Sequence, residues 1–188
     1  TFGIVGMGNI ARATARKAQV FGLNVISYDP YLPPWTAKEY RVEMVTSLEE
    51  LASRSDYVSV LVPLNKETKG MIDNRFFDSM KSTAYFINTC RGQTVDEASL
   101  IKTLEQRKIA GAAIDVFEQE PPDPNNPLFK LDNVIVTPHS AGTSTMSSSA
   151  SLTRVGQETA RILQETWPMS LVNSEVRSRI DTRSPARR

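Results

Sequence analysis

The chain has 188 residues, of which 40% are hydrophobic and 23% charged, a balance typical of folded globular proteins and not of disordered or collagen-like ones. Its 22 basic and 21 acidic residues give a net charge of +1, so no general electrostatic attraction to nucleic acid or to an anionic membrane is predicted. The longest apolar runs are far below the about 20 residues of a membrane-spanning helix, so no membrane span is predicted.

The cysteine content and the two ends of the chain set further limits. Cys90 is the single cysteine, so an internal disulfide is impossible and a reducing, cytoplasmic setting is predicted. The sequence starts on an apolar run without an initiator Met or a leader, which is interpreted as a chain cut before its first strand. Residues 1–175 suit one domain, and the arginine-rich tail, residues 176–188, is predicted to be disordered.

Short apolar runs alternate with longer segments of helical periodicity. This order predicts βαβ units and an α/β fold with a doubly wound, mostly parallel sheet. Several runs are apolar without alternation, as in strands that helices cover on both faces. The predicted strands are residues 2–5, 24–28, 42–45, 57–62, 84–88, 112–116 and 133–136.

Helices and rigid connections are predicted between these strands. Gly22 is a natural terminator for the first helix, and Ser47 with Glu50 forms the Ser-x-x-Glu pattern of a capping box at the start of the next. The helices are predicted over residues 10–21, from 47 onward, 96–108 and 147–166, and the proline-rich connections over 29–34 and 120–127.

The segment Gly6-Met7-Gly8-Asn9-Ile10-Ala11 has the dinucleotide fingerprint G-x-G-x-x-G/A between an apolar strand and a helix. Gly6 allows a tight turn, Gly8 leaves room for a pyrophosphate, and Ala11 lets the helix lie close to the strand. The amides at the start of that helix are expected to face the phosphates.

Asp29 ends the second predicted strand about 20 residues later, where a carboxylate accepts hydrogen bonds from the ribose hydroxyls of a dinucleotide. A carboxylate there also repels a 2′-phosphate, so NAD is favoured over NADP. The alternative role for Asp29 is that of a turn residue before Pro30.

Arg91 follows the predicted strand over residues 84–88, and ligands of open α/β sheets bind at the carboxyl ends of the strands. A permanently charged, planar side chain there suits the capture of a carboxylate, although a surface arginine in a turn has the same sequence pattern. Cys90 beside it is interpreted as a small buried residue and not as a nucleophile.

His139 is the only histidine and follows the last predicted strand on the same edge as Arg91. Its place between a proline and small residues leaves the ring accessible, which favours an acid/base role near neutral pH over a structural one. A carboxylate from residues 115–120 is expected to orient the ring. The spacing leaves Asp115, Glu118 and Glu120 open for this task.

Together these motifs resemble the NAD-binding domain of the D-isomer-specific 2-hydroxyacid dehydrogenases over nearly all of residues 1–175. The resemblance implies a Rossmann-type fold, NAD as cofactor, hydride transfer between NAD(H) and a D-2-hydroxy or 2-oxo acid, and a homodimer. It also implies a separate substrate domain, formed mainly by a segment before Gly3, that this chain lacks. The motifs that carry the resemblance are residues 3–11, 28–30, 62–64 with 67–68, 87–92, 115–121 and 137–142.

The roles of the family's residues carry over to matching positions. Arg91 matches the arginine that binds the substrate carboxylate, His139 the general acid/base, and Glu120 the carboxylate that pairs with it, so the resemblance selects Glu120. Asp115 matches a residue near the nicotinamide carboxamide. The cofactor-binding residues implied are Gly6, Gly8, Asn9, Ile10, Asp29, Pro63, Thr68, Thr89, Cys90, Arg91, Asp115 and His139, and no metal site is predicted.

Other functions stay open at this point. An NAD(H)-sensing binding module, like the transcriptional corepressors of this fold, keeps the same arginine, glutamate and histidine and is the main alternative. A methyltransferase with a glycine-rich first turn gives no role to Arg91, Glu120 and His139 together. The sequence does not choose among phosphoglycerate, glyoxylate, hydroxypyruvate and lactate as substrates. No partner beyond a small 2-oxo or 2-hydroxy acid and a second copy of the chain is predicted.

Overall fold

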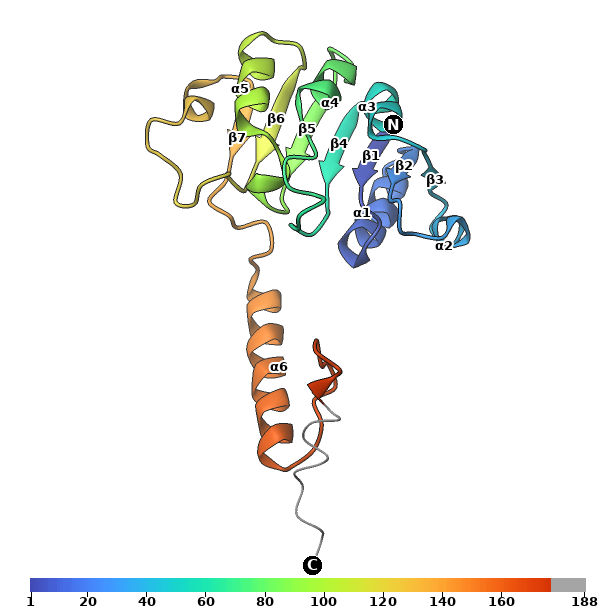
Figure 1. Ribbon diagram of the computed structural model, residues 1–188, viewed down its shortest axis with the longest axis vertical. Coiled ribbons are helices and arrows are strands. Elements are labelled where there is room, and N and C mark those ends of the chain that lie inside the picture. The colour runs from blue at the N-terminus through green and yellow to red at the C-terminus, as the bar shows by residue number, and fades with distance from the viewer. Residues whose placement is uncertain (177–188) are drawn as a thin grey trace, which may run out of the picture. The chain divides into compact units, whose positions relative to one another are not determined.

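The computed structural model describes residues 1–176, and a single sheet runs through residues 2–136 (Figure 1). The strand order is β3-β2-β1-β4-β5-β6-β7, and each neighbouring pair is parallel, which confirms the predicted α/β fold. The order reverses at β1, which lies between β2 and β4, and ligands of such sheets bind at this switch point. The strands are β1 (Phe2–Val5), β2 (Val25–Tyr28), β3 (Glu43–Met44), β4 (Tyr57–Val60), β5 (Tyr85–Asn88), β6 (Gly111–Ile114) and β7 (Val134–Val136).

Short helices connect the strands. Gly22, with φ of 79°, ends the first of them, and its amide donates a hydrogen bond to the Gln19 carbonyl at 2.9 Å. The connections contain α1 (Asn9–Val20), α2 (Pro34–Glu39), α3 (Leu48–Arg54), α4 (Asn74–Ser79) and α5 (Glu97–Glu105), with the 3₁₀ turns η1 (Gly92–Thr94) and η2 (Pro127–Lys130).

Two apolar clusters hold these helices on the sheet. In the smaller cluster, Ala11 and Ala15 of α1 pack with Ile4 of β1, and all three are fully buried. Because alanine has a small side chain, α1 lies close to β1, directly behind the glycine-rich turn. In the larger cluster, α3, α4 and α5 pack on strand residues that include Phe86, whose ring meets Phe77 edge-on with a centroid separation of 5.2 Å.

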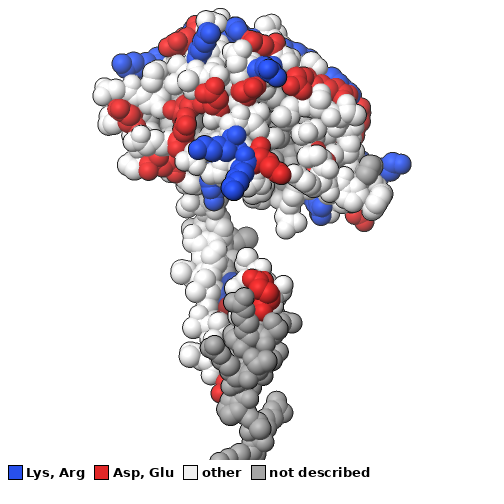
Figure 2. All heavy atoms as spheres, viewed as in Figure 1, with Lys and Arg blue, Asp and Glu red and all other residues white. Residues whose placement is uncertain are grey.

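The described chain divides into two compact units, one of residues Thr1–Ala141 and a second that begins at Gly142. Acidic and basic side chains are interspersed over the face of the first unit that Figure 2 shows. The second unit contains α6 (Thr145–Leu163), none of whose residues is buried. Among the described residues, no helix combines the length and apolarity needed to cross a membrane. The predicted disordered tail lies outside the described residues except for Val176.

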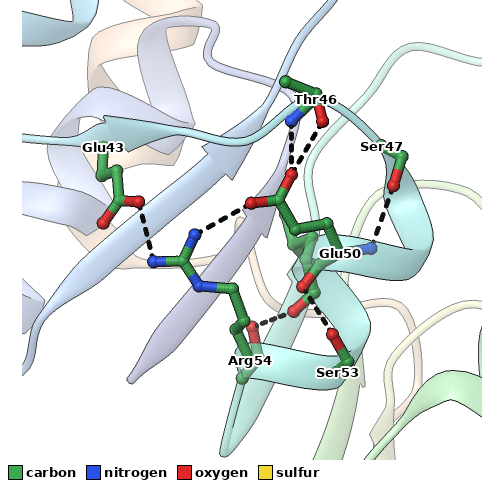
Figure 3. Close-up of polar contacts among 8 residues, drawn as sticks. Glu43, Thr46, Ser47, Glu50, Ser53 and Arg54 are labelled. Carbon is green, nitrogen blue, oxygen red and sulfur yellow. Dashed lines mark hydrogen bonds and ion pairs between the residues drawn. The ribbon is translucent and has the colours of Figure 1, made fainter.

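The capping box predicted for α3 is present in a modified form (Figure 3). The Ser47 hydroxyl accepts a hydrogen bond from the Glu50 amide at 3.0 Å, as the pattern predicts. The Glu50 carboxylate, however, accepts hydrogen bonds from the amide and hydroxyl of Thr46, at 2.9 and 2.8 Å. Arg54 at the end of α3 then joins Glu50 to Glu43 of β3, at 3.0 and 2.7 Å.

Some predicted boundaries were wrong. The fourth strand ends at Val60 and not at residue 62, and the helix predicted to reach residue 108 ends at Glu105. Helix α4 was not predicted, although Asp73 caps it by accepting hydrogen bonds from two backbone amides. The proline-rich segments, predicted to be irregular, end in helical turns, because a proline at the first helical position needs no hydrogen-bonded amide.

Candidate active site

The predicted functional residues lie in loops after the carboxyl ends of the strands, and parallel strands bring these ends to one edge of the sheet. The loops fall into two groups. We call the loops after β1, β2 and β4 (residues 6–8, 29–33 and 61–70) the glycine half. We call the loops after β5, β6 and β7 (residues 89–92, 115–121 and 137–141) the histidine half.

The turn after β1 combines a crowded glycine with an open one. Gly6 has φ of 90°, and a Cβ atom there would lie 2.8 Å from Val62 Cγ1, so only glycine fits. At Gly8 a Cβ atom would meet no heavy atom within 4 Å. The following α1 begins at Asn9, and the first amides of a helix have no partner within it. Open space beside free amides fits a phosphate group.

Asp29 is held against this turn. Its Oδ2 accepts a hydrogen bond from the Met7 amide at 2.9 Å, and its Oδ1 accepts one from the Tyr31 amide at 3.0 Å. The carboxylate lies on a cavity of about 450 Å³ that the three loops of the glycine half enclose, together with Leu48 and Met71. A cavity of this size suits a nucleoside. Asp29 therefore acts as a turn residue and also presents a carboxylate to the cavity.

The loop after β4 supports itself. The Thr68 hydroxyl donates a hydrogen bond to the Pro63 carbonyl at 2.6 Å, and the Asn65 side chain accepts from the amides of Glu67 and Thr68 at 2.8 and 2.9 Å. Pro63 and Thr68, both predicted cofactor residues, thus share one wall of the cavity. Asn65 was missed by sequence reasoning, although Asn is a common turn residue because its side chain can bond the backbone amide two residues on.

Asn88, at the end of β5, shapes the Arg91 loop. Its buried side chain donates a hydrogen bond to the Arg91 carbonyl and accepts one from the Cys90 amide, both at 3.1 Å. Cys90 is half-buried and not buried as predicted, and its thiol lies next to Asn88 Oδ1 and Thr94 Oγ1. Thr89 and the Arg91 side chain are exposed, and Arg91 Nη1 donates to the Cys90 carbonyl at 2.6 Å.

Gly92 brings the Arg91 loop against the loop after β6. A Cβ atom at Gly92 would lie 1.9 Å from the carbonyl carbon of Phe117 and 2.0 Å from its oxygen. The two backbones are therefore in direct contact, which places Arg91 beside residues 115–121. Sequence reasoning missed this role of Gly92, since nothing in the local pattern shows which backbone it approaches.

Asp115 fixes the loop that carries His139. Its Oδ1 accepts hydrogen bonds from the Thr137 hydroxyl at 2.5 Å and the Ser140 amide at 2.8 Å, and its Oδ2 accepts from the Ala141 amide at 2.9 Å. Burial raises the pKa of Asp115, but the hydrogen bonds from Thr137, Ala141 and Ser140 outweigh it, and the pKa is lowered. The carboxylate predicted to lie near the nicotinamide is thus held by donors of the protein itself.

His139 meets Glu120 across the edge of the sheet. Its Nδ1 lies 2.7 Å from Glu120 Oε2, and the two side chains are 49% and 36% exposed. Of the three carboxylates left open by spacing, Glu120 contacts the ring, and Asp115 instead accepts from the backbone amides that follow His139. Glu118 is held by its own amide, which donates to Glu97. His139 has φ of 50°, a conformation unusual for a residue with a side chain, and its amide donates to the Asp115 carbonyl at 2.9 Å.

The pair has a defined electrostatic arrangement. The hydrogen bond with His139 is the main reason why the pKa of Glu120 is lowered, and the Phe117 amide and the charge of Arg91 act in the same direction. An ionised carboxylate only accepts hydrogen bonds, so Nδ1 of His139 carries a proton and Nε2 is left for proton exchange. Among residues 1–176, no group of three or more His, Cys, Asp or Glu side chains could hold a metal ion.

Comparison with known protein families gives a match over the whole first unit. Residues 1–141 match the model of the D-isomer specific 2-hydroxyacid dehydrogenase NAD binding domain. Among curated proteins, the chain is 44% identical over 176 residues to a glyoxylate reductase of Korarchaeum cryptofilum, covering 94% of this chain and 53% of that protein. It is 38% identical over 173 residues to a D-3-phosphoglycerate dehydrogenase of Methanocaldococcus jannaschii, covering 92% of this chain and 33% of that protein.

Solved structures give the same result. An NAD complex of a D-isomer specific 2-hydroxyacid dehydrogenase from Lactobacillus delbrueckii superposes with a TM-score of 0.83 at 30% identity, over 92% of this chain and 56% of that one. The holo form of Rhodotorula graminis D-mandelate dehydrogenase has a TM-score of 0.84 at 34% identity, over 92% of this chain and 51% of that one. The chain thus spans between one third and about half of the length of these four relatives.

Proposed function

Since the chain belongs to the D-isomer specific 2-hydroxyacid dehydrogenases and matches their NAD-binding domain, we propose that it holds NAD(H) and the acid/base pair for reduction of a 2-oxo acid to a D-2-hydroxy acid. One observation carries this proposal. His139 Nδ1 lies 2.7 Å from Glu120 on the strand edge that also holds the glycine-rich turn. The curated relatives are named as reductases and dehydrogenases, and they lend no support to a sensing module.

The glycine half suits the dinucleotide. The open space at Gly8 and the free amides at the start of α1 would receive the pyrophosphate, with Asn9 and Ile10 in the first turn of the helix. Asp29 would accept hydrogen bonds from the adenosine ribose, since its carboxylate faces the cavity and each oxygen has a further lone pair. Pro63 and Thr68 line the opposite wall of that cavity.

The histidine half suits the 2-oxo acid. When bound, NADH supplies a hydride to C2 of the acid. The Arg91 guanidinium would bind the substrate carboxylate in a bidentate manner, since only its Nη1 donates to the Cys90 carbonyl and the other donors remain for the acid. His139 would donate a proton from Nε2 to the C2 oxygen while Glu120 holds Nδ1. Positive charge from both side chains stabilises the negative charge that forms on this oxygen.

The catalytic assignment is tested by joining this chain to the remainder of the Korarchaeum cryptofilum glyoxylate reductase, in place of the matching segment. The chimera should oxidise NADH with glyoxylate. The substitutions His139→Ala and Arg91→Ala should each lower kcat/KM by about 100-fold or more, the typical contribution of an acid/base group. NADH affinity should stay within about threefold, and exposed Arg75→Ala on α4 is the control. Normal turnover in both variants would contradict the assignment.

Cofactor preference is tested on the chain itself. NADH should raise the melting temperature more than NADPH does, because the Asp29 carboxylate repels a 2′-phosphate. In Asp29→Asn the difference between the two cofactors should shrink. Equal stabilisation of the unsubstituted chain by NADH and NADPH would count against the role of Asp29.

We also propose a homodimer in a cytoplasmic setting. The end of α1 carries Val20 and Phe21, which are 86% and 85% exposed, and large exposed apolar side chains are typical of association surfaces. Sedimentation velocity at micromolar concentration should give twice the chain mass of 20.9 kDa. A monomer at micromolar concentration would contradict the proposed dimer.

A further inference from the structure

Tyr31 donates hydrogen bonds to two different carboxylates, one from its backbone amide and one from its side chain. Its amide donates to Asp29 Oδ1 at 3.0 Å, and its phenol donates to Glu67 Oε2. Tyr31 lies in the loop after β2 and Glu67 in the loop after β4, and the strands of these loops flank β1 on its two sides. The side-chain contact therefore bridges the glycine-rich turn.

The two loops joined by this contact are the two walls of the 450 Å³ cavity. Residues 28–31 form one wall, and Pro63, Asn65, Glu67 and Thr68 contribute to the other. Among the hydrogen bonds found in the described part of the chain, the one between Tyr31 and Glu67 alone connects residues 29–33 with residues 61–70. Tyr31 and Glu67 thus form the single hydrogen-bonded link between the two walls in this part of the structure.

Each wall is rigid without the other. Asp29 ties the first wall to the Met7 amide, and Asn65 and Thr68 hold the second wall through bonds within their own loop. The contact is also dispensable for the core, because Tyr31 is 75% exposed and Glu67 is exposed. Exposed polar pairs contribute little to fold stability, so this one can open and close at small cost.

The chemistry of the pair keeps the bond available at physiological pH. The hydrogen bond to Glu67 and the negative charge of that residue raise the pKa of Tyr31 above its usual value of 10.0, so the phenol remains a donor. Hydrogen bonds to a charged acceptor are stronger than those between neutral groups.

We propose that Tyr31 and Glu67 are cofactor-positioning residues, whose hydrogen bond closes the outer side of the adenosine cavity and slows release of the dinucleotide. The proposal rests on the placement of adenosine in this cavity given above. Glu67 acts here as the hydrogen-bond acceptor for Tyr31 on the opposite wall. Its negative charge matters less for cofactor binding than this bond does.

The test compares Tyr31→Phe, Glu67→Ala, the double variant and Glu67→Gln. The dissociation constant for ADP-ribose, which contains the adenosine half, is measured by calorimetry, and the dissociation rate of NADH by stopped-flow fluorescence. Each single variant should weaken ADP-ribose binding and speed NADH release by about fivefold, the usual effect of one solvent-exposed hydrogen bond. The double variant should be no worse than either single one.

Two comparisons separate positioning from other roles. Glu67→Gln keeps an acceptor oxygen and should restore part of the loss seen in Glu67→Ala, which a pure charge effect would not allow. The controls are Tyr85→Phe and Glu105→Gln, which remove an exposed phenol and an exposed carboxylate away from the cavity. All variants should melt within about 2 °C of the unsubstituted chain, since an exposed pair adds little stability.

The outcomes are distinct. Losses that add in the double variant, or no loss in Tyr31→Phe, would overturn the proposal. A gain in NADPH affinity that is equal in Glu67→Gln and Glu67→Ala would also overturn it and assign Glu67 a role in cofactor choice. If the unsubstituted chain does not bind ADP-ribose, the proposed function fails first, whereas binding that all four variants retain refutes only the positioning role.

Discussion

The glycine half and the histidine half use the same edge of the sheet in opposite ways. In the glycine half the backbone leaves space, since a Cβ atom at Gly8 would meet no heavy atom within 4 Å and Asp29 lines a cavity of about 450 Å³. In the histidine half the loops are packed against one another, since Gly92 contacts the backbone of Phe117 and Asp115 is 3% exposed. The cavity of about 420 Å³ in this half is lined by His139 and Glu120, so it presents the acid/base pair. Binding a large cofactor needs room, whereas proton transfer needs a side chain held in one place.

An added methyl group should therefore lower the stability of the fold at Gly92 and lower cofactor affinity at Gly8. This is the largest expected difference between the halves. Gly92→Ala places Cβ at 1.9 Å from a backbone atom that cannot move away easily. The unfolding free energy should fall by about 3 kcal/mol or more, the range of severe overpacking. Urea denaturation of the chain without cofactor measures it.

Gly8→Ala is the matched control. Gly8 has φ of −71° and open space around it, so alanine should change the unfolding free energy by less than about 1 kcal/mol. The same methyl group lies where the pyrophosphate is proposed to bind, so NADH affinity should fall by about tenfold or more. Equal stability losses at the two glycines would contradict the comparison.

The second prediction concerns the buried carboxylate of the histidine half. Asp115→Asn keeps the size of the side chain but turns an NH₂ group toward donors that Asp115 accepts from, such as Ser140 or Ala141. An unsatisfied buried donor costs about 1–3 kcal/mol, and thermal or urea unfolding at neutral pH should show a loss of this size. Glu105→Gln, exposed and distant from these loops, should show none.

The pH dependence of this loss has a defined sign. Because the folded pKa of Asp115 is lowered, its contribution is present above the unfolded value of about 3.9 and is lost as the pH falls through the folded value. The stability difference between the unsubstituted chain and Asp115→Asn should be constant from neutral pH down to about 5 and shrink below about 4. A difference that grows on acidification would contradict this assignment.

The two halves also differ in how far the sequence predicts them. Two signals of the glycine half are local in sequence, a fingerprint of six contiguous positions and an acidic residue at the end of the next strand. The strands were found for the same reason, since each apolar run is a local signal. Helices α2 and α4 were missed because six residues are fewer than two helical turns and show no periodicity.

The histidine half depends on contacts between distant segments. Asp115, Glu118 and Glu120 lie within six residues, and the path of a proline-rich loop decides which of them reaches a ring 19 positions beyond the last. Spacing does not encode that path. The contact of Gly92 with Phe117 and the hydrogen bond of Thr137 to Asp115 are invisible for the same reason.

The third prediction tests the link inside the histidine half. His139→Ala removes the main cause of the lowered pKa of Glu120, so this pKa should move up toward its ordinary value. It should stay slightly low, because the Phe117 amide still donates to Oε1 at 3.1 Å. Titration of the carboxyl carbon by NMR measures the change, and an unaltered pKa would show that the contact is not kept in solution.

The smallest effect is expected at the opposite edge of the sheet, where Arg54 joins Glu43 to Glu50 (Figure 3). Arg54 precedes β4 and contacts neither half of the site, and its side chain is 40% exposed. Water and salt screen exposed ion pairs, so Arg54→Ala should lower the melting temperature by less than about 3 °C. The shift should shrink further at about 1 M salt, where the screening length is about 3 Å. NADH affinity should be unchanged, because Glu43, Glu50 and Arg54 do not line the cavity. A loss of affinity would show that the two edges of the sheet are coupled.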